Sequence, residues 1–249
     1  MKPRLFTLTL VLALAGSPLV AQPSDAAKEA IDGLKGAFKE KIPTDITHFV
    51  GKCAEVWEEA DDKQKGEIQK LAKRGLKNRD RDVRVAFVEA TTKMKGGKKD
   101  KWGTKSNDLF AALLKLKPTQ KDIDFMDRVV RGVGVIANKK GVPILTKLLK
   151  YKDYSIVAAA GEALGGYKDA DIKIKKEAVK EILKIYGSIA NQAREPRNTT
   201  AQKRLRIIQK SMELGLKTLT GQNIVGAFNW QRWWNNTGKK ARTWETAGN

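Results

Sequence analysis

The sequence contains few of the residues on which catalysis and covalent cross-linking depend. Among its 249 residues there is one cysteine, Cys53, and one histidine, His48. A single cysteine excludes an intramolecular disulfide, so Cys53 is most simply a buried small hydrophobe, with an intermolecular disulfide as the alternative. On a helix the two residues diverge by roughly 140° and form no obvious nucleophile and base pair. We therefore predict no catalytic residue, no metal site and no cofactor.

Two acidic pairs and one short glycine motif are also explained without a catalytic centre. Asp61 with Asp62 and Asp80 with Asp82 stand where helices are expected to begin. Carboxylates at that position cap free backbone N–H groups and suit the helix dipole. The Gly-Val-Gly motif at residues 132–134 lacks the third glycine and the preceding strand of a dinucleotide-binding loop. We interpret these residues as structural.

Acidic residues are in short supply, which gives the chain a strong positive charge. It has 28 Asp and Glu against 49 Lys and Arg, a formal net charge of +21, with 31% charged and 41% hydrophobic residues. This profile is typical of a soluble protein, and the length allows one or two ordinary domains with an apolar core. A strongly basic balance favours anionic partners.

After residue 21 no apolar run approaches the length of a membrane span. Before it, Lys2 and Arg4 precede the apolar residues 5–15, and the small residue Ala21 offers a cleavage point. This order is typical of a secretory signal peptide. We predict a cleaved signal peptide at residues 1–21 and a secreted or periplasmic mature protein without a transmembrane span. A buried N-terminal helix or an uncleaved anchor is the alternative.

Strand-like alternation is scarce, and from residue 24 onward apolar residues recur at steps of three and four. This period predicts an all-α protein. The helices are expected near residues 24–38, 43–56, 68–76, 83–90, 109–116, 123–136, 143–149, 155–164, 173–189 and 202–219. Polar turns, glycines such as Gly96-Gly97, and prolines separate them, so that consecutive helices form hairpins. One hairpin cannot bury its own apolar face, and a repeated hairpin therefore predicts an α-solenoid.

Two segments carry a more specific pattern. Residues 148–165 contain a Leu-Leu pair, a turn with Asp153 and an Ala-rich stretch that ends in Ala-Leu-Gly, and residues 80–84 read Asp-Arg-Asp-Val-Arg. Both resemble units of the HEAT-repeat family, although Ile156-Val157 replaces the Val-Arg pair of that family. The resemblance implies stacked antiparallel helical hairpins over residues 22–219, with residues 107–140 as a degenerate unit between the two. A generic helical bundle is the alternative.

Basic residues follow one face of each of the last two long helices. Apolar residues occupy the opposite face of both helices. The basic residues are Lys173, Lys176, Lys180 and Lys184 on the first helix and Lys203, Arg206 and Lys210 on the second. Arg194, Arg197 and Arg204 are nearby in sequence. If these faces line one surface, they attract a polyanion such as an anionic glycan, a lipid headgroup or nucleic acid. The alternative is that they only solvate the helices.

Residues 220–249 differ in composition and hold a tryptophan cluster. Trp230, Trp233 and Trp234 fall at i, i+3 and i+4, so on a short helix they share one face. Buried against the last repeat, they would close the open end of the core, which predicts a Trp-rich C-terminal cap with a basic tail. The ending is similar to one found on some secreted bacterial HEAT-repeat proteins. The alternative is an exposed platform that stacks on sugar rings.

These observations favour a non-enzymatic secreted or periplasmic binding or scaffolding protein, whose partner is another protein or an anionic polymer. Two other functions remain open. One is a nucleic-acid-processing enzyme, since some base-excision DNA glycosylases use HEAT-like solenoids, and the predicted signal peptide argues against it. The other is a carbohydrate-binding accessory protein that uses Trp230, Trp233 and Trp234.

Overall fold

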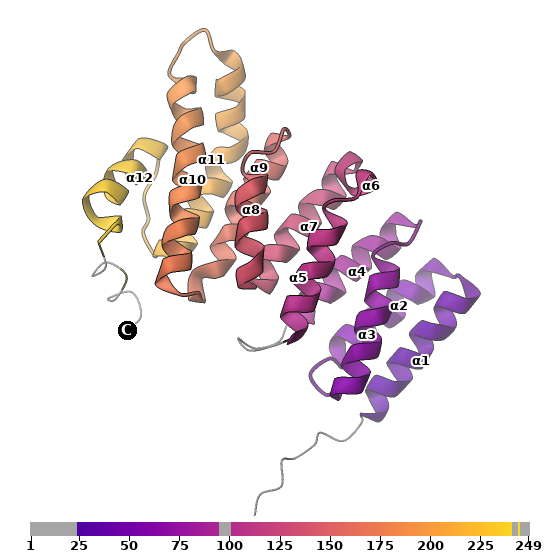
Figure 1. Cartoon of the computed structure of the whole chain (residues 1–249). Helices are drawn as coiled ribbons and strands as arrows, with labels where there is room; N and C mark the ends of the chain where they lie inside the picture. The colour runs from indigo at the N-terminus through magenta and orange to yellow at the C-terminus, as the bar shows by residue number, and fades with distance from the viewer. Residues whose placement is uncertain (1–23, 95–100, 241–243, 245–249) are drawn as a thin grey trace, which may run out of the picture.

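The computed structural model describes residues 24–94, 101–240 and 244 (Figure 1). The predicted signal peptide at residues 1–21, the glycines at 96 and 97 and most of the basic tail after residue 240 lie outside the described residues. Every regular element among the described residues is helical. The all-α class predicted from the sequence is therefore confirmed for this part of the chain.

The helices follow one another with short connections. They are α1 (Asp25–Glu40), α2 (Pro43–Glu55), α3 (Asp62–Gly75), α4 (Arg81–Lys93), α5 (Lys101–Leu113), α6 (Lys117–Lys121), α7 (Ile123–Ile136), α8 (Val142–Leu148), α9 (Tyr154–Leu164), α10 (Ile172–Ala193), α11 (Thr199–Thr220) and α12 (Ala227–Trp233). The described residues also form two short 3-10 helices, η1 (Lys139–Gly141) and η2 (Gly165–Asp169), and a π-helical turn, η3 (Trp234–Gly238).

Acidic side chains cap several of these helices. At the start of α3, Asp61 accepts the backbone N–H of Gln64 at 2.7 Å, and the Gln64 side chain accepts the backbone N–H of Asp61 at 2.9 Å. At the start of α4, Asp80 accepts the backbone N–H of Asp82 at 2.8 Å. Each bond satisfies a donor that the helix itself leaves free. The capping role predicted for these carboxylates is confirmed.

The helices pack in two rows. In one row α2, α4, α7, α9 and α11 lie side by side, and in the other α1 contacts α3, α3 contacts α5, and α8 contacts α10. Across the rows α1 packs on α2, α3 on α4, α5 on α7, α8 on α9, and α10 on α11. Figure 1 shows α3, α5, α8 and α10 in front of α4, α7, α9 and α11. The helices of each row therefore contact those of the other row along the described chain.

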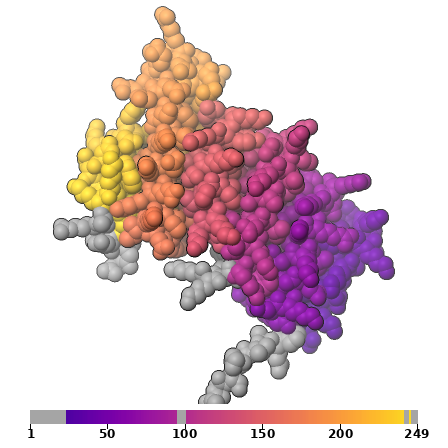
Figure 2. All heavy atoms as spheres, in the orientation of Figure 1, coloured from indigo at the N-terminus to yellow at the C-terminus, as the bar shows by residue number. Residues whose placement is uncertain are grey.

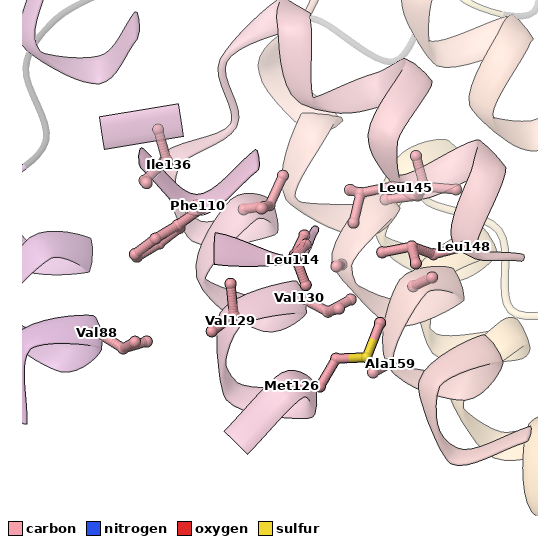
Figure 3. Close-up of a cluster of buried hydrophobic side chains, with 14 of the residues drawn as sticks. Val88, Phe110, Leu114, Met126, Val129, Val130, Ile136, Leu145, Leu148 and Ala159 are labelled. Atoms are coloured by element: carbon pink, nitrogen blue, oxygen red, sulfur yellow. The ribbon is translucent and has the colours of Figure 1, made fainter. Parts of the chain in front are cut away.

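The core runs between the two rows. Figure 3 shows a cluster of buried side chains in its middle, to which Phe110 of α5, Val129 and Val130 of α7, and Leu145 of α8 belong. All four side chains are fully buried. The same apolar cluster continues from Ala27 in α1 to the tryptophans after α11, so the whole described chain shares one core.

Glycines bring neighbouring helices of the row α2, α4, α7, α9 and α11 close together. A Cβ on Gly215 of α11 would clash with the backbone oxygen of Gly161 of α9, and one on Gly134 of α7 would clash with the backbone of Ala163. The motif at residues 132–134, which we set aside as a dinucleotide loop, thus lets α7 and α9 approach closely. Only a residue without a side chain permits this separation.

The structure corrects the predicted start of one helix. α5 begins at Lys101 instead of near Leu109 and ends at Leu113, before the short helix α6. Its first turn carries Trp102, which packs edge-on against Trp57 with ring centroids 5.8 Å apart. The early part of α5 buries polar residues in the core. The spacing of apolar residues in the sequence therefore did not predict that the helix begins there.

The last helix pair is much longer than the pair before it. α10 and α11 have 22 residues each, whereas α8 has 7 and α9 has 11. At about 1.5 Å per residue the two long helices span roughly 33 Å. Figure 2 shows the orange end of this pair projecting beyond the neighbouring surface.

Candidate functional site

The predicted basic residues of α10 lie on the side of the helix opposite its buried face. Lys173, Lys180 and Lys184 are exposed. Lys176 is partly buried, and its Nζ donates a 3.1 Å hydrogen bond to the backbone oxygen of Lys239 beyond α12. Acidic residues Glu177 and Glu181 are interspersed with these lysines, so this row, called the α10 row below, has a diluted positive charge.

The predicted basic residues of α11 form a second row with less acidic surroundings. Lys203, Arg206 and Lys210 are exposed and lie opposite the buried side chains of Ile208 and Met212. α11 contains one carboxylate, that of Glu213, which accepts hydrogen bonds from Tyr186 of α10 and from the backbone N–H of Gly226, directly before α12. The three basic residues, called the α11 row below, therefore form a face of one sign.

The structure does not bring the two rows together. α10 and α11 pack against each other through their buried faces, and each row lies on the opposite side of its helix. In Figure 1 α10 stands in front of α11. The α10 row and the α11 row therefore face different sides of the pair and cannot act as one continuous patch.

Glu213 connects three parts of the chain, and the sequence patterns missed this role. Its Oε1 accepts the hydroxyl of Tyr186 at 2.6 Å, the side-chain amide of Gln209 at 3.1 Å and the backbone N–H of Gly226 at 2.9 Å. Burial raises the pKa of Tyr186, and the hydrogen bond to Glu213 and its charge raise it further. The segment that leads into α12 is thereby fixed to α10 and α11.

Ion pairing differs between the first nine helices and the last two long helices. In the earlier part Arg81 pairs with Asp122 at 2.9 Å, and Arg131 pairs with Glu162 at 2.7 Å. Among the described residues, no carboxylate oxygen lies within 4.0 Å of a basic group of either row. Residues 171–249 hold 16 Lys and Arg against 6 Asp and Glu. The rows therefore keep their charge.

The tryptophan cluster packs against the end of the core. α12 lies on α10, Trp230 and Trp234 are buried, and Trp233 is partly buried. Trp233 contacts Trp230 with ring centroids 5.6 Å apart and Trp244 with centroids 6.4 Å apart. These contacts leave no platform of three exposed indole rings, and they favour a cap over a sugar-stacking surface. The exposed aromatic residue nearby is Phe228.

The residues with the greatest chemical reactivity are not assembled into a centre. Cys53 is fully buried, and burial raises the pKa of its thiol to about 12. His48 is exposed and lies edge-on to Phe49. Across residues 24–94, 101–240 and 244, no three His, Cys, Asp or Glu side chains are placed to hold a metal ion together. In the same residues no helix is both long enough and apolar enough to cross a membrane.

Comparison with known proteins adds no assignment. No family model matches the chain, and no curated protein sequence matches it.

Proposed function

We propose that this protein is a non-enzymatic binding or scaffolding module that is exported from the cytoplasm and binds an anionic polymer through the α11 row. We further propose that its helices form a HEAT-like α-solenoid closed by the Trp-rich cap. The basic start and short apolar run of residues 1–21 support export.

Local geometry supports the HEAT-like assignment. In the segment at residues 80–84, Asp80 caps α4, and Arg84 donates to the backbone oxygens of Asn78 and Arg79 at 3.0 and 2.9 Å. In the segment at residues 148–165, Asp153 caps α9. Asp80 and Arg84 in the first segment and Asp153 in the second, which carry the resemblance, thus stabilise the turn between the two helices of a pair.

The observation that carries the binding proposal is that, within the described part of the chain, no carboxylate pairs with the α11 row and none lies between its members in sequence. Exposed lysines that only solvate a helix are commonly interspersed with acidic residues, as on α10. A face of one sign keeps a positive potential that concentrates and steers an anionic chain. Because salt screens exposed charges over about 10 Å at 0.1 M, binding of this kind weakens as ionic strength rises.

Binding of residues 22–249 to immobilised heparin and to neutral dextran tests the proposal. The variant reverses the row with Lys203→Glu, Arg206→Glu and Lys210→Glu. The matched control reverses three exposed lysines of α3 with similar helical spacing, Lys63→Glu, Lys70→Glu and Lys73→Glu, which changes the net charge equally. We expect the row variant to lose at least about tenfold in heparin affinity, or ~1.4 kcal/mol, and the control to lose much less.

Three outcomes contradict the proposal. Equal losses in both variants would mean that heparin senses the total charge and not the α11 row. Binding that no salt concentration weakens, or no binding to any anionic polymer, would instead favour a protein partner recognised by another surface.

A further inference from the structure

A cleft lies at the step between the short pair α8–α9 and the long pair α10–α11. It has a volume of about 240 Å³ and is lined by the turn after α8, the start of α9, the second half of α10 and the start of α11. Figure 1 shows α10 and α11 extending past the turn between α8 and α9. The difference in helix length therefore creates this cleft.

The floor of the cleft is apolar and its walls are polar. Leu149, Val157 and Ile189 line it and are buried. Tyr151 and Tyr154 are partly exposed, and among the described residues neither hydroxyl has a hydrogen-bond partner in the protein. A tyrosine with an apolar ring and a free hydroxyl suits a ligand that is itself amphipathic.

Two basic residues line the cleft, Arg204 of α11 and the exposed Lys150 of the turn after α8, and Arg204 is the one held in place. Its guanidinium carbon lies 4.8 Å from the ring centroid of Tyr154, so the planar group is held by a cation–π contact. The nearest carboxylate in sequence to this ring is Asp153, which accepts the backbone N–H and the hydroxyl of Ser155 at 2.9 and 2.6 Å. No ion pair to Arg204 is formed by the described residues.

A guanidinium fixed in this way presents N–H donors at its edge in a planar fork. Such a fork binds a carboxylate or sulfate with two parallel hydrogen bonds, which a lysine ammonium does not reproduce. On the α10 side, Ser188 and Gln192 are exposed at the cleft and add hydroxyl and amide groups. The cleft thus combines a fixed guanidinium and the ammonium of Lys150 with several neutral hydrogen-bonding groups and an apolar floor.

We propose that this cleft binds one acidic sugar unit of an anionic polysaccharide, with Arg204 holding its carboxylate or sulfate. The tyrosine hydroxyls, Ser188 and Gln192 pair with sugar hydroxyls, and the floor receives the C–H groups of the ring. The proposal rests on the proposed function and specifies the class of polymer. Since Arg204 adjoins Lys203 in sequence, neighbouring units of the same polymer reach the α11 row.

An acidic peptide fits these walls less well. The walls are helices, whose backbone N–H groups are bonded within the helix, so an extended peptide finds no strand edge to join. The cleft is also smaller than the roughly 300–1,000 Å³ of common ligand pockets, and its floor offers no deep hole for an apolar side chain. A single sugar unit does not require a deep pocket.

Short oligosaccharides test the site because one that occupies the cleft reaches at most the part of the α11 row next to it. The probes are a hyaluronan tetrasaccharide with carboxylates only, a sulfated dextran oligosaccharide, a neutral dextran oligosaccharide and an oligoglutamate peptide. The variants of the full mature chain are Arg204→Gln and Arg204→Lys, with Lys70→Gln on α3 as a control that removes the same charge far from the cleft and the α11 row. Circular dichroism checks that each variant folds.

We expect both Arg204 variants to weaken binding of an acidic oligosaccharide by at least about tenfold, and Lys70→Gln to weaken it by no more than about threefold. The carboxylate and sulfate probes identify which oxyanion is preferred. Ser188→Phe fills the cleft from an exposed position of α10 and leaves Arg204 unchanged. We expect it to abolish binding, and it therefore tests the site even if the Arg204 variants do not fold.

Three outcomes overturn the cleft proposal. They are no saturable binding of any acidic oligosaccharide, an effect of Arg204→Gln no larger than that of Lys70→Gln, or oligoglutamate binding that is equally tight and equally dependent on Arg204. If heparin binding by the α11 row persists in these cases, the proposed function stands and the cleft assignment alone fails.

Discussion

The hydroxyl of Tyr186 on α10 donates a 2.6 Å hydrogen bond to Oε1 of Glu213 on α11, and the same oxygen accepts the backbone N–H of Gly226. Gly226 has a φ of 86°, in the region that favours glycine, and stands directly before α12. One partly buried carboxylate oxygen therefore fixes the angle at which the chain leaves α11 to form the cap.

Removal of this carboxylate should loosen the cap. Glu213→Ala leaves the Tyr186 hydroxyl and the Gly226 N–H without their acceptor, and we expect a loss of about 1–3 kcal/mol in the free energy of unfolding. Tyr186→Phe removes one donor and should cost about 1 kcal/mol. Urea denaturation measures both. Tyr151→Phe removes a hydroxyl that has no partner in the protein and serves as the control. Equal stability of all three variants would show that the bond has no structural role.

The contact between α9 and α11 makes a second prediction. Gly215→Ala places a methyl group against the backbone oxygen of Gly161, so the helices must separate. We expect a loss of at least about 1–3 kcal/mol in unfolding free energy, in the range of overpacked cores. Gly36→Ala in α1 meets nothing within 4 Å and should stabilise the protein by about 0.5–1 kcal/mol. Thermal denaturation of both variants checks the opposite signs.

The Arg81–Asp122 pair predicts a loss of stability in acid. The hydrogen bond from Arg81 lowers the pKa of Asp122, and the backbone N–H of Phe125 and the charges of Arg81 and Arg84 lower it further. Stability from this carboxylate is present above its unfolded pKa of about 3.9 and is lost as pH falls through the lower folded value.

Asp122→Asn isolates that contribution, because asparagine still accepts the Phe125 N–H as an N-cap. Since both partners are partly solvated, we expect a modest cost of about 0.5–1 kcal/mol near neutral pH. The difference from the unchanged protein should shrink below pH ~4. Urea midpoints measured across acid pH provide the comparison, and a difference that is constant with pH would contradict the assignment.

Cys53 should be inert while the protein is folded. Its burial raises the pKa to about 12, so the neutral thiol is favoured. Stability from the buried thiol is present below its unfolded pKa and is lost as pH rises through the folded value. At about pH 8 we expect a chromogenic disulfide reagent to react only as fast as the protein opens, and quickly in urea. Immediate reaction of the folded protein, or a purified disulfide-linked dimer, would contradict this placement.

Helical periodicity predicted most helices because their apolar faces form the core between the two rows. It did not mark the first turns of α5, where Ser106 and Asn107 are buried in place of apolar residues. Gln69 of α3 donates to the Ser106 hydroxyl at 3.0 Å, which satisfies a polar group that would otherwise be costly to bury. The contact between Trp57 and Trp102 joins distant residues and leaves no local pattern.

The sequence allowed us to predict which single residues of the candidate site are exposed, but not how these residues are arranged in space. Lys203 and Lys210 could be placed on the exposed face of a helix because Ile208 and Met212 define the other face. That the α10 row and the α11 row face different sides follows from the pairing of the two helices, which no single-helix pattern contains. The cleft around Arg204 depends on the difference in length between two neighbouring helix pairs.

The row formed by α2, α4, α7, α9 and α11 also determines how the molecule would respond to tension. Polar contacts between successive helix pairs, such as Lys35–Glu67 and Ser211–Glu162, join residues 32 to 49 positions apart. A force applied to the two ends of the described chain therefore passes through one helix interface after another. The interfaces bear this force in series. The weakest interface therefore sets the force at which the protein first lengthens, and the others keep their structure until it has opened.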